Sequence, residues 1–290
     1  MILRRRFLIA ALAAALVLSG CGAEGGSADS SAAASSAVSA AEVSLPYGVY
    51  IGMDADEAVE IGPCETAVID ASGFTAPQIA ALHTRAAAVY SYLNVGSIET
   101  FRDYYGRFQG DTLGPYEGWP GEYWIDVSSS RWQSFVVDTL AAALREKGVD
   151  GLFLDNFDVY GQNPGEAVYQ GLLAILRGLR AQGLPVIVNG GDEFIRRALE
   201  SGDLSGLVYG VNQESVFTAD VSGTDGPSGP QDAETTSFYE TYLEECAQAG
   251  LQVFLIEYGA EGTVRDRAAA YCREHGFCCF FAASADLNES

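Results

Sequence analysis

A short apolar run, Leu152-Phe153-Leu154, ends at the acid Asp155, and two further polar side chains follow at Asn156 and Asp158. A continuous apolar run of this length is typical of a strand that is buried on both faces. Helical patterns precede and follow this run, so the strand belongs to an alternating α/β order. A carboxylate at the carboxyl end of a parallel strand lies where such folds build active sites. For one acid alone, a helix cap or a loop position is an equally good interpretation.

Other predicted strands end in the same way, and this repetition is what points to a site. The strand ends carry acids or amides, whereas Lys and His do not occur at them: Asp70, Asn94, Asp126, Asp155, Asn189, Glu214 and Glu257. On a barrel of parallel strands, all these positions would face one opening. A cluster of this composition suits a neutral polyhydroxylated ligand or a cationic ligand, and it does not suit a phosphate or a carboxylate.

Asp155 and Glu214 are the candidate catalytic residues, because hydrolysis of a glycosidic bond needs two carboxyl groups on opposite sides of that bond. One group protonates the leaving oxygen, and the other attacks the anomeric carbon or activates water. Neighbouring acids repel one another, so we expect one of the two to have a raised pKa. We assign Glu214 as acid/base and Asp155 as nucleophile, although the sequence also allows the reverse. Asn189 would hold a sugar hydroxyl or orient one of the acids.

The order of strands and helices predicts a (β/α)8 barrel with an extra N-terminal strand. Nine strands are expected, at Tyr47–Ile51, Ala67–Asp70, Val89–Val95, Tyr123–Val127, Leu152–Asp155, Val186–Asn189, Leu207–Asn212, Gln252–Glu257 and Phe277–Phe281. Helices are expected near Pro77–Ala86, Trp132–Lys147, Glu166–Gln182, Glu193–Ser201, Thr235–Gly250 and Thr263–His275. Counting the barrel from the second strand leaves Tyr47–Ile51 outside it. An open doubly wound sheet is the alternative, but the length and the number of repeats favour the barrel.

The N-terminal residues are expected to be a targeting segment. Arg4, Arg5 and Arg6 precede an apolar stretch, and Leu18-Ser19-Gly20-Cys21 resembles a bacterial lipoprotein cleavage box. We therefore expect residues 1–21 to be a signal peptide with lipid on Cys21, and residues 22–46, which are rich in Ala, Ser and Gly, to be a flexible tether. Residues 47–290 form the barrel domain. The protein should be held at the cell membrane by lipid and face outside the cytoplasm.

Charge and composition restrict the possible partners. The formal charge is −23, and removal of the three N-terminal arginines would lower it to −26. Such a chain offers no basic surface for nucleic acid, although it could attract a cationic ligand. The five cysteines after Cys21 contain no CxxC pair, and the two histidines, His83 and His275, lie in helical patterns. No metal site and no cofactor are expected, and a monomer is expected.

Aromatic residues gather before and after the Tyr123–Val127 strand. Trp119, beside Pro120 in a predicted loop, is the best candidate for stacking against a sugar ring, whereas Trp132 opens a helix and should belong to the core.

Several segments, in this order, resemble glycoside hydrolase family 114, the endo-α-1,4-polygalactosaminidases. They are Tyr92-Leu-Asn-Val-Gly96 with Glu99, Trp124-Ile-Asp-Val127, Gly148-Val-Asp-Gly-Leu-Phe-Leu-Asp-Asn-Phe-Asp158, Val188-Asn-Gly190, Asn212-Gln-Glu214 and Ile256-Glu-Tyr258. The segment around Asp155 is the most specific of them. One departure from the family pattern occurs at the end of the second predicted barrel strand, Val89–Val95. There Asn94 and Ser97 replace the serine and the first acid that the family usually has, while Glu99 remains.

The resemblance implies a (β/α)8 barrel with an added N-terminal strand that hydrolyses α-1,4-linked galactosamine polymers, with Asp155 and Glu214 matching the catalytic acids. Together with the strand ends, it gives the candidate substrate-binding residues Asp70, Tyr92, Asn94, Glu99, Trp119, Asp126, Asn156, Asp158, Asn189, Gln213, Glu257 and Tyr258. A partly deacetylated galactosamine polymer is cationic, which would give the acidic surface a purpose.

Two other classes of protein are alternatives to this hypothesis. A metal-dependent hydrolase would need histidines near the strand ends, where there are none. A lipoprotein that binds amino sugars without cleaving them would need the acids and Asn189, but not a spaced pair of carboxyl groups. Asp155 and Glu214 side chains that point apart would favour binding alone.

Overall fold

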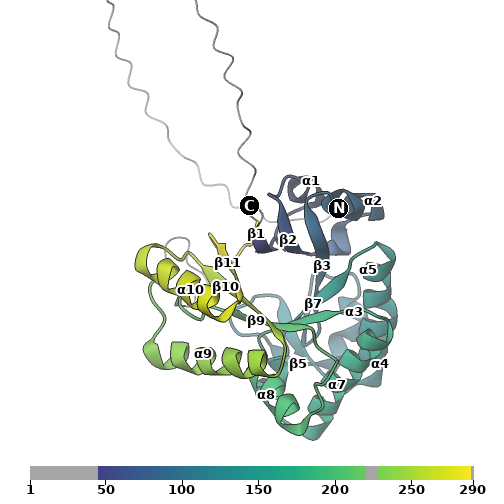
Figure 1. The fold of residues 1–290 in the computed structure, drawn as a ribbon. Coiled ribbons are helices and arrows are strands. Elements are labelled where there is room, and N and C mark those ends of the chain that lie inside the picture. Colours follow the sequence, from purple (N-terminus) through teal and green to yellow (C-terminus); the bar gives the residue numbers. More distant parts are fainter. Residues whose placement is uncertain (1–44, 220–227, 289–290) are drawn as a thin grey trace, which may run out of the picture. The chain divides into compact units, whose positions relative to one another are not determined.

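The computed structural model describes residues 45–219 and 228–288, and its main sheet is a nearly closed barrel of eight parallel strands (Figure 1). In order around the barrel these are β1 (Leu45–Val49), β2 (Cys64–Ile69), β3 (Ala86–Asn94), β7 (Gly151–Asp155), β8 (Val186–Asn189), β9 (Gly210–Glu214), β10 (Gln252–Tyr258) and β11 (Cys278–Ala282). All seven pairings between neighbours in this order are parallel. The predicted (β/α)8 barrel is confirmed.

Helices follow the barrel strands and cover the outside of the barrel (Figure 1). The longer ones are α2 (Ala76–Leu82), α7 (Glu166–Ala181), α8 (Asp192–Ser201), α9 (Ala233–Gln248) and α10 (Gly262–His275). The helix predicted near Trp132–Lys147 is one continuous stretch with a π-helical centre, formed by α4 (Ser130–Ser134), η3 (Phe135–Ala141) and α5 (Ala142–Glu146). Short helices complete the connections: α1 (Ala55–Ala58), η1 (Ala71–Gly73), α3 (Tyr105–Phe108), η2 (Gln109–Asp111) and α6 (Val159–Gln162).

One detail of the predicted strand assignment is wrong, because the extra strand is not the N-terminal one. Strand β1 pairs in parallel with β2, with Tyr47 opposite Thr66, and is a full member of the barrel. The strand expected at Tyr123–Val127 is instead β6 (Glu122–Ile125), which lies outside the barrel. Because β1 belongs to the barrel and β6 does not, the number of barrel strands before β7 is unchanged. Strands β7 and β9 are therefore the fourth and sixth barrel strands, as in the predicted order.

A second, three-stranded sheet accounts for β6. It is antiparallel, with the order β4 (Ser97–Glu99), β6, β5 (Thr112–Pro115), and the chain forms it between barrel strands β3 and β7. The apolar side chains of β6 that resembled a barrel strand are buried, as shown by Trp124 and Ile125. They pack in the core beneath this insertion, and the sheet becomes one wall of the cavity described below.

Trp132 packs where the insertion meets the barrel, as expected for a core residue. Its side chain is completely buried, its indole Nε1 donates to the Val95 carbonyl at 2.9 Å, and its ring lies 5.1 Å from that of Phe108. Trp132→Ala is expected to lower the free energy of unfolding by about 3–5 kcal/mol, because it leaves a large cavity and an unpaired carbonyl. Urea denaturation would measure this. Trp119→Ala, at a residue 49% exposed, should change stability by less than about 0.5 kcal/mol.

The predicted signal peptide (1–21), its lipidated Cys21 and nearly all of the tether (22–46) lie outside the described residues, so these remain predictions. Strand β1 begins at Leu45, two residues before the expected start of the barrel domain at 47. In the part of the chain that the structure describes, no helix combines the length and the apolar character needed to cross a membrane.

Candidate active site

A cavity of about 530 Å³ opens at the carboxyl ends of the barrel strands. Side chains from five successive barrel strands, or from the residues that follow them directly, reach it: Asp70 after β2, Tyr92 from β3, Asp155 from β7, Asn189 from β8 and Glu214 from β9. The antiparallel sheet and its loops supply another wall. Active sites of this fold lie at this end of the barrel.

Asp155 and Glu214 lie side by side, connected by the side chain of Asn189. The Asn189 amide nitrogen Nδ2 donates to Oδ1 of Asp155 at 2.9 Å and to Oε1 of Glu214 at 2.8 Å. Because both oxygens contact one nitrogen, they lie no further apart than the two distances added together, about 5.7 Å. The two carboxyl groups therefore face the same small volume instead of pointing apart.

Asn189 is itself held in place by buried polar groups beneath it. Asn212 Nδ2 donates to Oδ1 of Asn189 at 2.6 Å, and the Tyr47 hydroxyl donates to Oδ1 of Asn212 at 3.2 Å. These bonds fix which atom of the Asn189 amide is oxygen, so that its NH₂ group must point at the two acids. Strands β1, β8 and β9 together position the carboxylate pair.

Each acid also has a second donor of its own. Oδ1 of Asp155 accepts the backbone N–H of Asn156 at 2.9 Å, and Oε2 of Glu214 accepts the Tyr258 hydroxyl at 2.8 Å. Asn156 has a positive φ of 65°, a backbone conformation that asparagine tolerates better than most residues. Burial and the neighbouring acid keep the pKa of Tyr258 well above its usual value, so this hydroxyl keeps its proton and donates it.

Burial, and then the nearby Glu214 carboxylate, raise the pKa of Asp155 to about 7, against the opposing effect of its hydrogen bonds to Asn189 and Asn156. Two carboxylates this close do not both ionise easily. Below about pH 7 the pair therefore holds one proton, which belongs to the pair as a unit. One protonated and one ionised carboxyl group is the state that glycosidic bond cleavage needs.

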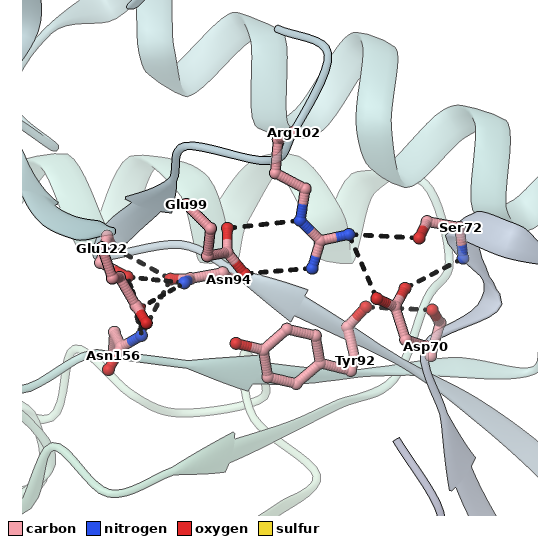
Figure 2. A network of polar contacts seen from close by, with 10 residues as sticks. Asp70, Ser72, Tyr92, Asn94, Glu99, Arg102, Glu122 and Asn156 are labelled. Carbon is pink, nitrogen blue, oxygen red and sulfur yellow. Dashed lines mark hydrogen bonds and ion pairs between the residues drawn. The ribbon is translucent and has the colours of Figure 1, made fainter. Parts of the chain in front are cut away.

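Asp70 and Glu99 are joined by an arginine that the sequence analysis missed (Figure 2). Arg102 NH1 contacts Oδ2 of Asp70 at 3.1 Å, and its NH2 and Nε contact the two oxygens of Glu99 at 3.1 and 3.3 Å. The guanidinium is largely shielded, with a side-chain exposure of 13%. Both acids are thus partly neutralised within the protein.

Glu122, another residue that the sequence analysis missed, lies beside Asn94 and Asn156 (Figure 2). Its Oε1 accepts hydrogen bonds from Nδ2 of Asn94 at 2.9 Å and Nδ2 of Asn156 at 3.1 Å, and from the Ser97 hydroxyl. Burial, and then the negative charge of Glu99, raise the pKa of Glu122, although its hydrogen bonds oppose this.

Most of the predicted site residues line the cavity. Besides Asp155 and Glu214 they are Asp70, Tyr92, Glu99, Trp119, Asn156, Asp158, Asn189, Gln213 and Tyr258. The structure brings these together as expected, and whether each contacts a substrate stays a prediction.

Three predicted residues lie away from the cavity. Asn94 is buried beneath it, where its amide supports Ser97 and Glu122. The expectation that Asp126 faces the barrel opening is wrong, because it follows β6 in the antiparallel sheet and its carboxylate accepts from the backbone and hydroxyl of Ser128. The same expectation is wrong for Glu257, whose completely buried carboxylate is occupied by the loop after β9.

The Glu257 carboxylate stabilises that loop through several hydrogen bonds. It accepts the backbone N–H groups of Val216, Phe217 and Thr218 at 3.0, 3.1 and 2.9 Å, and the Thr218 hydroxyl at 2.7 Å. The loop directly follows Glu214, so these hydrogen bonds stabilise the backbone next to Glu214.

The main residues missed are Arg102, Phe101, Tyr116 and Glu122, all from the antiparallel sheet and its loops. Arg102 could have been found, because it lies three positions after Glu99. Phe101 is 70% exposed at the edge of the cavity, and Tyr116 stacks on Trp124 with ring centroids 4.1 Å apart. Nothing in the sequence distinguishes Glu122 from the exposed acids around it.

Several solved structures have similar folds. The glycoside hydrolase domain of PelA from Pseudomonas aeruginosa has a TM-score of 0.68 and 20% identity, over 86% of this chain and 97% of that one. Ega3 from Aspergillus fumigatus, solved in complex with galactosamine, has a TM-score of 0.64 and 18% identity, over 85% and 94%. An α-galactosidase from Thermus thermophilus has a TM-score of 0.52 and 13% identity, over 82% and 57%. At these identities the likeness shows the fold.

The assignment to a family comes from the sequence of the chain as a whole. No curated protein sequence matches it. The model of glycoside-hydrolase family GH114, however, matches residues 27–286, which is far more than half of the chain and includes the cavity with its two carboxyl groups. The chain therefore belongs to glycoside hydrolase family GH114 and is a glycoside hydrolase.

Proposed function

We propose that this protein cleaves α-1,4-linked galactosamine-containing polysaccharide by a two-carboxylate mechanism that retains the configuration at the anomeric carbon. The observation that carries the proposal is the sharing of the Asn189 amide by Asp155 and Glu214. Carboxyl groups about 5–5.5 Å apart suit a retaining glycosidase, whereas an inverting one needs about 6.5–9.5 Å to admit a water molecule. The limit of about 5.7 Å between the two oxygens supports the retaining mechanism.

Asp155 is proposed as the nucleophile. Both of its hydrogen bonds are accepted by Oδ1, and among the described residues no hydrogen bond to Oδ2 is found. Oδ2 is therefore available to attack the anomeric carbon and form a covalent glycosyl-enzyme, while the bond to the leaving oxygen breaks.

Glu214 is proposed as the acid/base. It gives its proton to the leaving oxygen, and the Tyr258 hydroxyl at 2.8 Å then stabilises the carboxylate that remains. In the second half of the reaction Glu214 takes a proton from water, and the water oxygen displaces Asp155 from the sugar.

The charge of the cavity supports an amino sugar as substrate. Arg102 is the single arginine or lysine among the residues that line it. The lining contains seven acids: Asp70, Glu99, Glu122, Asp155, Asp158, Glu214 and Asp286. A ligand that carries ammonium groups would relieve this excess of negative charge. The structure of the related fold of Ega3 was solved with galactosamine, which agrees with this choice.

The enzyme is proposed to act at the outer face of the cell membrane as a monomer. A signal peptide at residues 1–21, lipid on Cys21 and a tether over residues 22–46 would hold the barrel at the surface, where a polysaccharide is accessible.

Product analysis tests the proposal. Residues 45–290 would be incubated with purified α-1,4-galactosamine polymer, and the products identified by mass spectrometry, with NMR to follow the configuration of the first product. Short oligomers that first appear as the α-anomer are expected. Binding of the polymer without any products would support a binding protein instead, and β-products would contradict the retaining mechanism.

A pH profile provides a further prediction. Because the pKa of Asp155 is raised to about 7, the proton that the pair must hold is present below that pH and lost above it. We expect kcat/KM to fall above about pH 7, approaching tenfold for each pH unit. Initial rates between about pH 5 and pH 9, with circular dichroism to confirm folding, would check this. A rate that keeps rising to pH 9 would contradict it.

A further inference from the structure

Glu122 has no part in the cleavage chemistry proposed above, yet it is built into the wall of the cavity. One of its oxygens, Oε1, accepts the hydrogen bonds from Asn94 and Asn156 (Figure 2). The same oxygen accepts the hydrogen bond from the Ser97 hydroxyl. Within residues 45–219 and 228–288, no hydrogen bond to the other oxygen, Oε2, is found, and no cationic side chain forms an ion pair with Glu122. The carboxylate is thus fixed through one oxygen, and the other is left for a ligand.

Four of the other six acids that line the cavity differ from Glu122 in this respect. Asp70 and Glu99 share the guanidinium of Arg102, and Asp155 and Glu214 form the proposed catalytic pair. The donors to Glu122, by contrast, are two neutral amides and a hydroxyl. A half-buried carboxylate without a compensating cation is a good partner for a positively charged group of a ligand.

Asn156 connects this carboxylate directly to the reaction centre. Its backbone N–H donates to Oδ1 of Asp155 at 2.9 Å, while its side-chain amide donates to Oε1 of Glu122 at 3.1 Å. The positive φ of Asn156 allows one residue to hold both acids. The Tyr92 side chain lies in the same region, and its pKa is raised by burial and then by charges that include Asp155 and Glu122. A sugar unit whose anomeric carbon is at Asp155 would therefore present a ring substituent to Glu122.

We propose that Glu122 selects the sugar unit bound beside Asp155 for a free amino group, by pairing Oε2 with the ammonium nitrogen, and disfavours the N-acetylated unit. The inference rests on the proposed function and adds a specificity residue to it. An acetamide carries no charge, and its acetyl group would occupy the space next to Oε2. The carboxylate would then stay buried without its partner, which is the arrangement that makes polar sites reject analogues strongly.

The test compares wild type with Glu122→Gln on two forms of one polymer. The first is the fully deacetylated α-1,4-galactosamine polymer, and the second is the same material with about half of its amines chemically acetylated. Gln keeps an oxygen that can accept from Asn94 and Asn156 but removes the charge. On the deacetylated polymer, kcat/KM should fall by roughly 10- to 100-fold, mostly through KM, as for loss of a hydrogen bond to a charged group.

The products of the half-acetylated polymer give a second readout. Mass spectrometry of the new reducing ends should show almost only free amines with the wild type, and a clear rise in acetylated ends with Glu122→Gln. Glu117→Gln is the matched control, because Glu117 is an exposed acid in the same loop region that does not line the cavity. It removes the same charge and should leave both rate and products unchanged.

The outcomes separate this inference from the proposed function. No cleavage of either polymer by the wild type would overturn the proposed function. Normal cleavage, but an unchanged share of acetylated ends in Glu122→Gln, would overturn the role of Glu122. An equal loss of kcat on both polymers with unchanged KM would also overturn it, since Glu122 would then act on the reaction itself. If Glu122→Gln failed to fold, the wild-type products alone could reject the inference. They would do so if their reducing ends were acetylated as often as the sugar units of the polymer.

Discussion

Glu214→Gln and Asp155→Asn are each expected to lower kcat for polymer cleavage by about 10³-fold or more. Each variant keeps a side chain that can still accept from Asn189, but it removes the acid/base in one case and the nucleophile in the other. The two roles can be separated with an aryl galactosaminide whose leaving group needs no protonation. Glu214→Gln should recover much of the first step on this substrate, whereas Asp155→Asn should not.

Stability provides the control for this experiment. The pKa of Asp155 in the folded protein, about 7, lies well above the usual value for an aspartate, so the ionised carboxylate opposes folding at neutral pH. Asp155→Asn should therefore melt at the same temperature as the wild type or higher. Asp126→Asn changes an acid that lies away from the cavity and should keep near-normal activity. Substantial activity in Glu214→Gln on the polymer would remove Glu214 from the mechanism.

Asn189→Leu should have the second largest effect, a loss of about 10²-fold in kcat. The substitution keeps the size of the side chain but removes an amide that contacts both acids, and displacing catalytic groups by about 1 Å can cost this much. It also leaves the buried Asn212 amide without its acceptor, at a cost of about 1–3 kcal/mol of stability.

Asn189→Asp distinguishes positioning from simple destabilisation. It keeps the oxygen that accepts from Asn212, and it places a third negative charge beside the pair. The pKa of the pair should rise, so the fall of kcat/KM on the alkaline side should move to higher pH. Asn163→Leu, in the loop between α6 and α7, is the control and should leave the profile unchanged. If Asn189→Asp had the wild-type profile at the wild-type rate, Asn189 would have no part in positioning the acids.

The fold could be predicted from the sequence because barrel strands that are buried on both faces read as short apolar runs between helices. The error concerned β6, whose residues Tyr123, Trp124 and Ile125 give the same local signal. What distinguishes it is its pairing with β4 and β5, which depends on contacts that a local pattern does not contain. The strand expected at Leu207–Asn212 starts later, at Gly210, so that Glu214 ends the strand instead of following it.

The centre of the site could be predicted because chain position alone brings strand ends together on a barrel. Asp155, Asn189 and Glu214 follow from this rule. The wall that contains Glu122 and Arg102 could not be predicted in this way, because side-chain packing, and not strand order, decides the path of an insertion. Glu257 shows that a residue at a strand end need not face the cavity. Its carboxylate turns instead toward a loop that offers several backbone N–H groups.

The incomplete closure of the barrel has a consequence for local opening of the protein. Strands β1 and β11 are at the two ends of the sheet order, and among the described residues no ladder pairing joins them. The junction is held instead by the Tyr50 and Phe280 rings, 5.5 Å apart, and by the Gly52 N–H, which donates to the Leu287 carbonyl at 3.0 Å.

Unpaired strand edges with few cross-links open at a lower free energy than the interior of a sheet. In hydrogen exchange, the amides along this junction should therefore lose protection before those of β7, β8 and β9. Ile51, Gly52 and Leu287 also line the cavity, so the part of its wall that opens most easily is the part farthest along the sheet from the catalytic strands. Fluctuations there can widen the cavity for a bulky polymer while Asp155, Asn189 and Glu214 keep their relative positions.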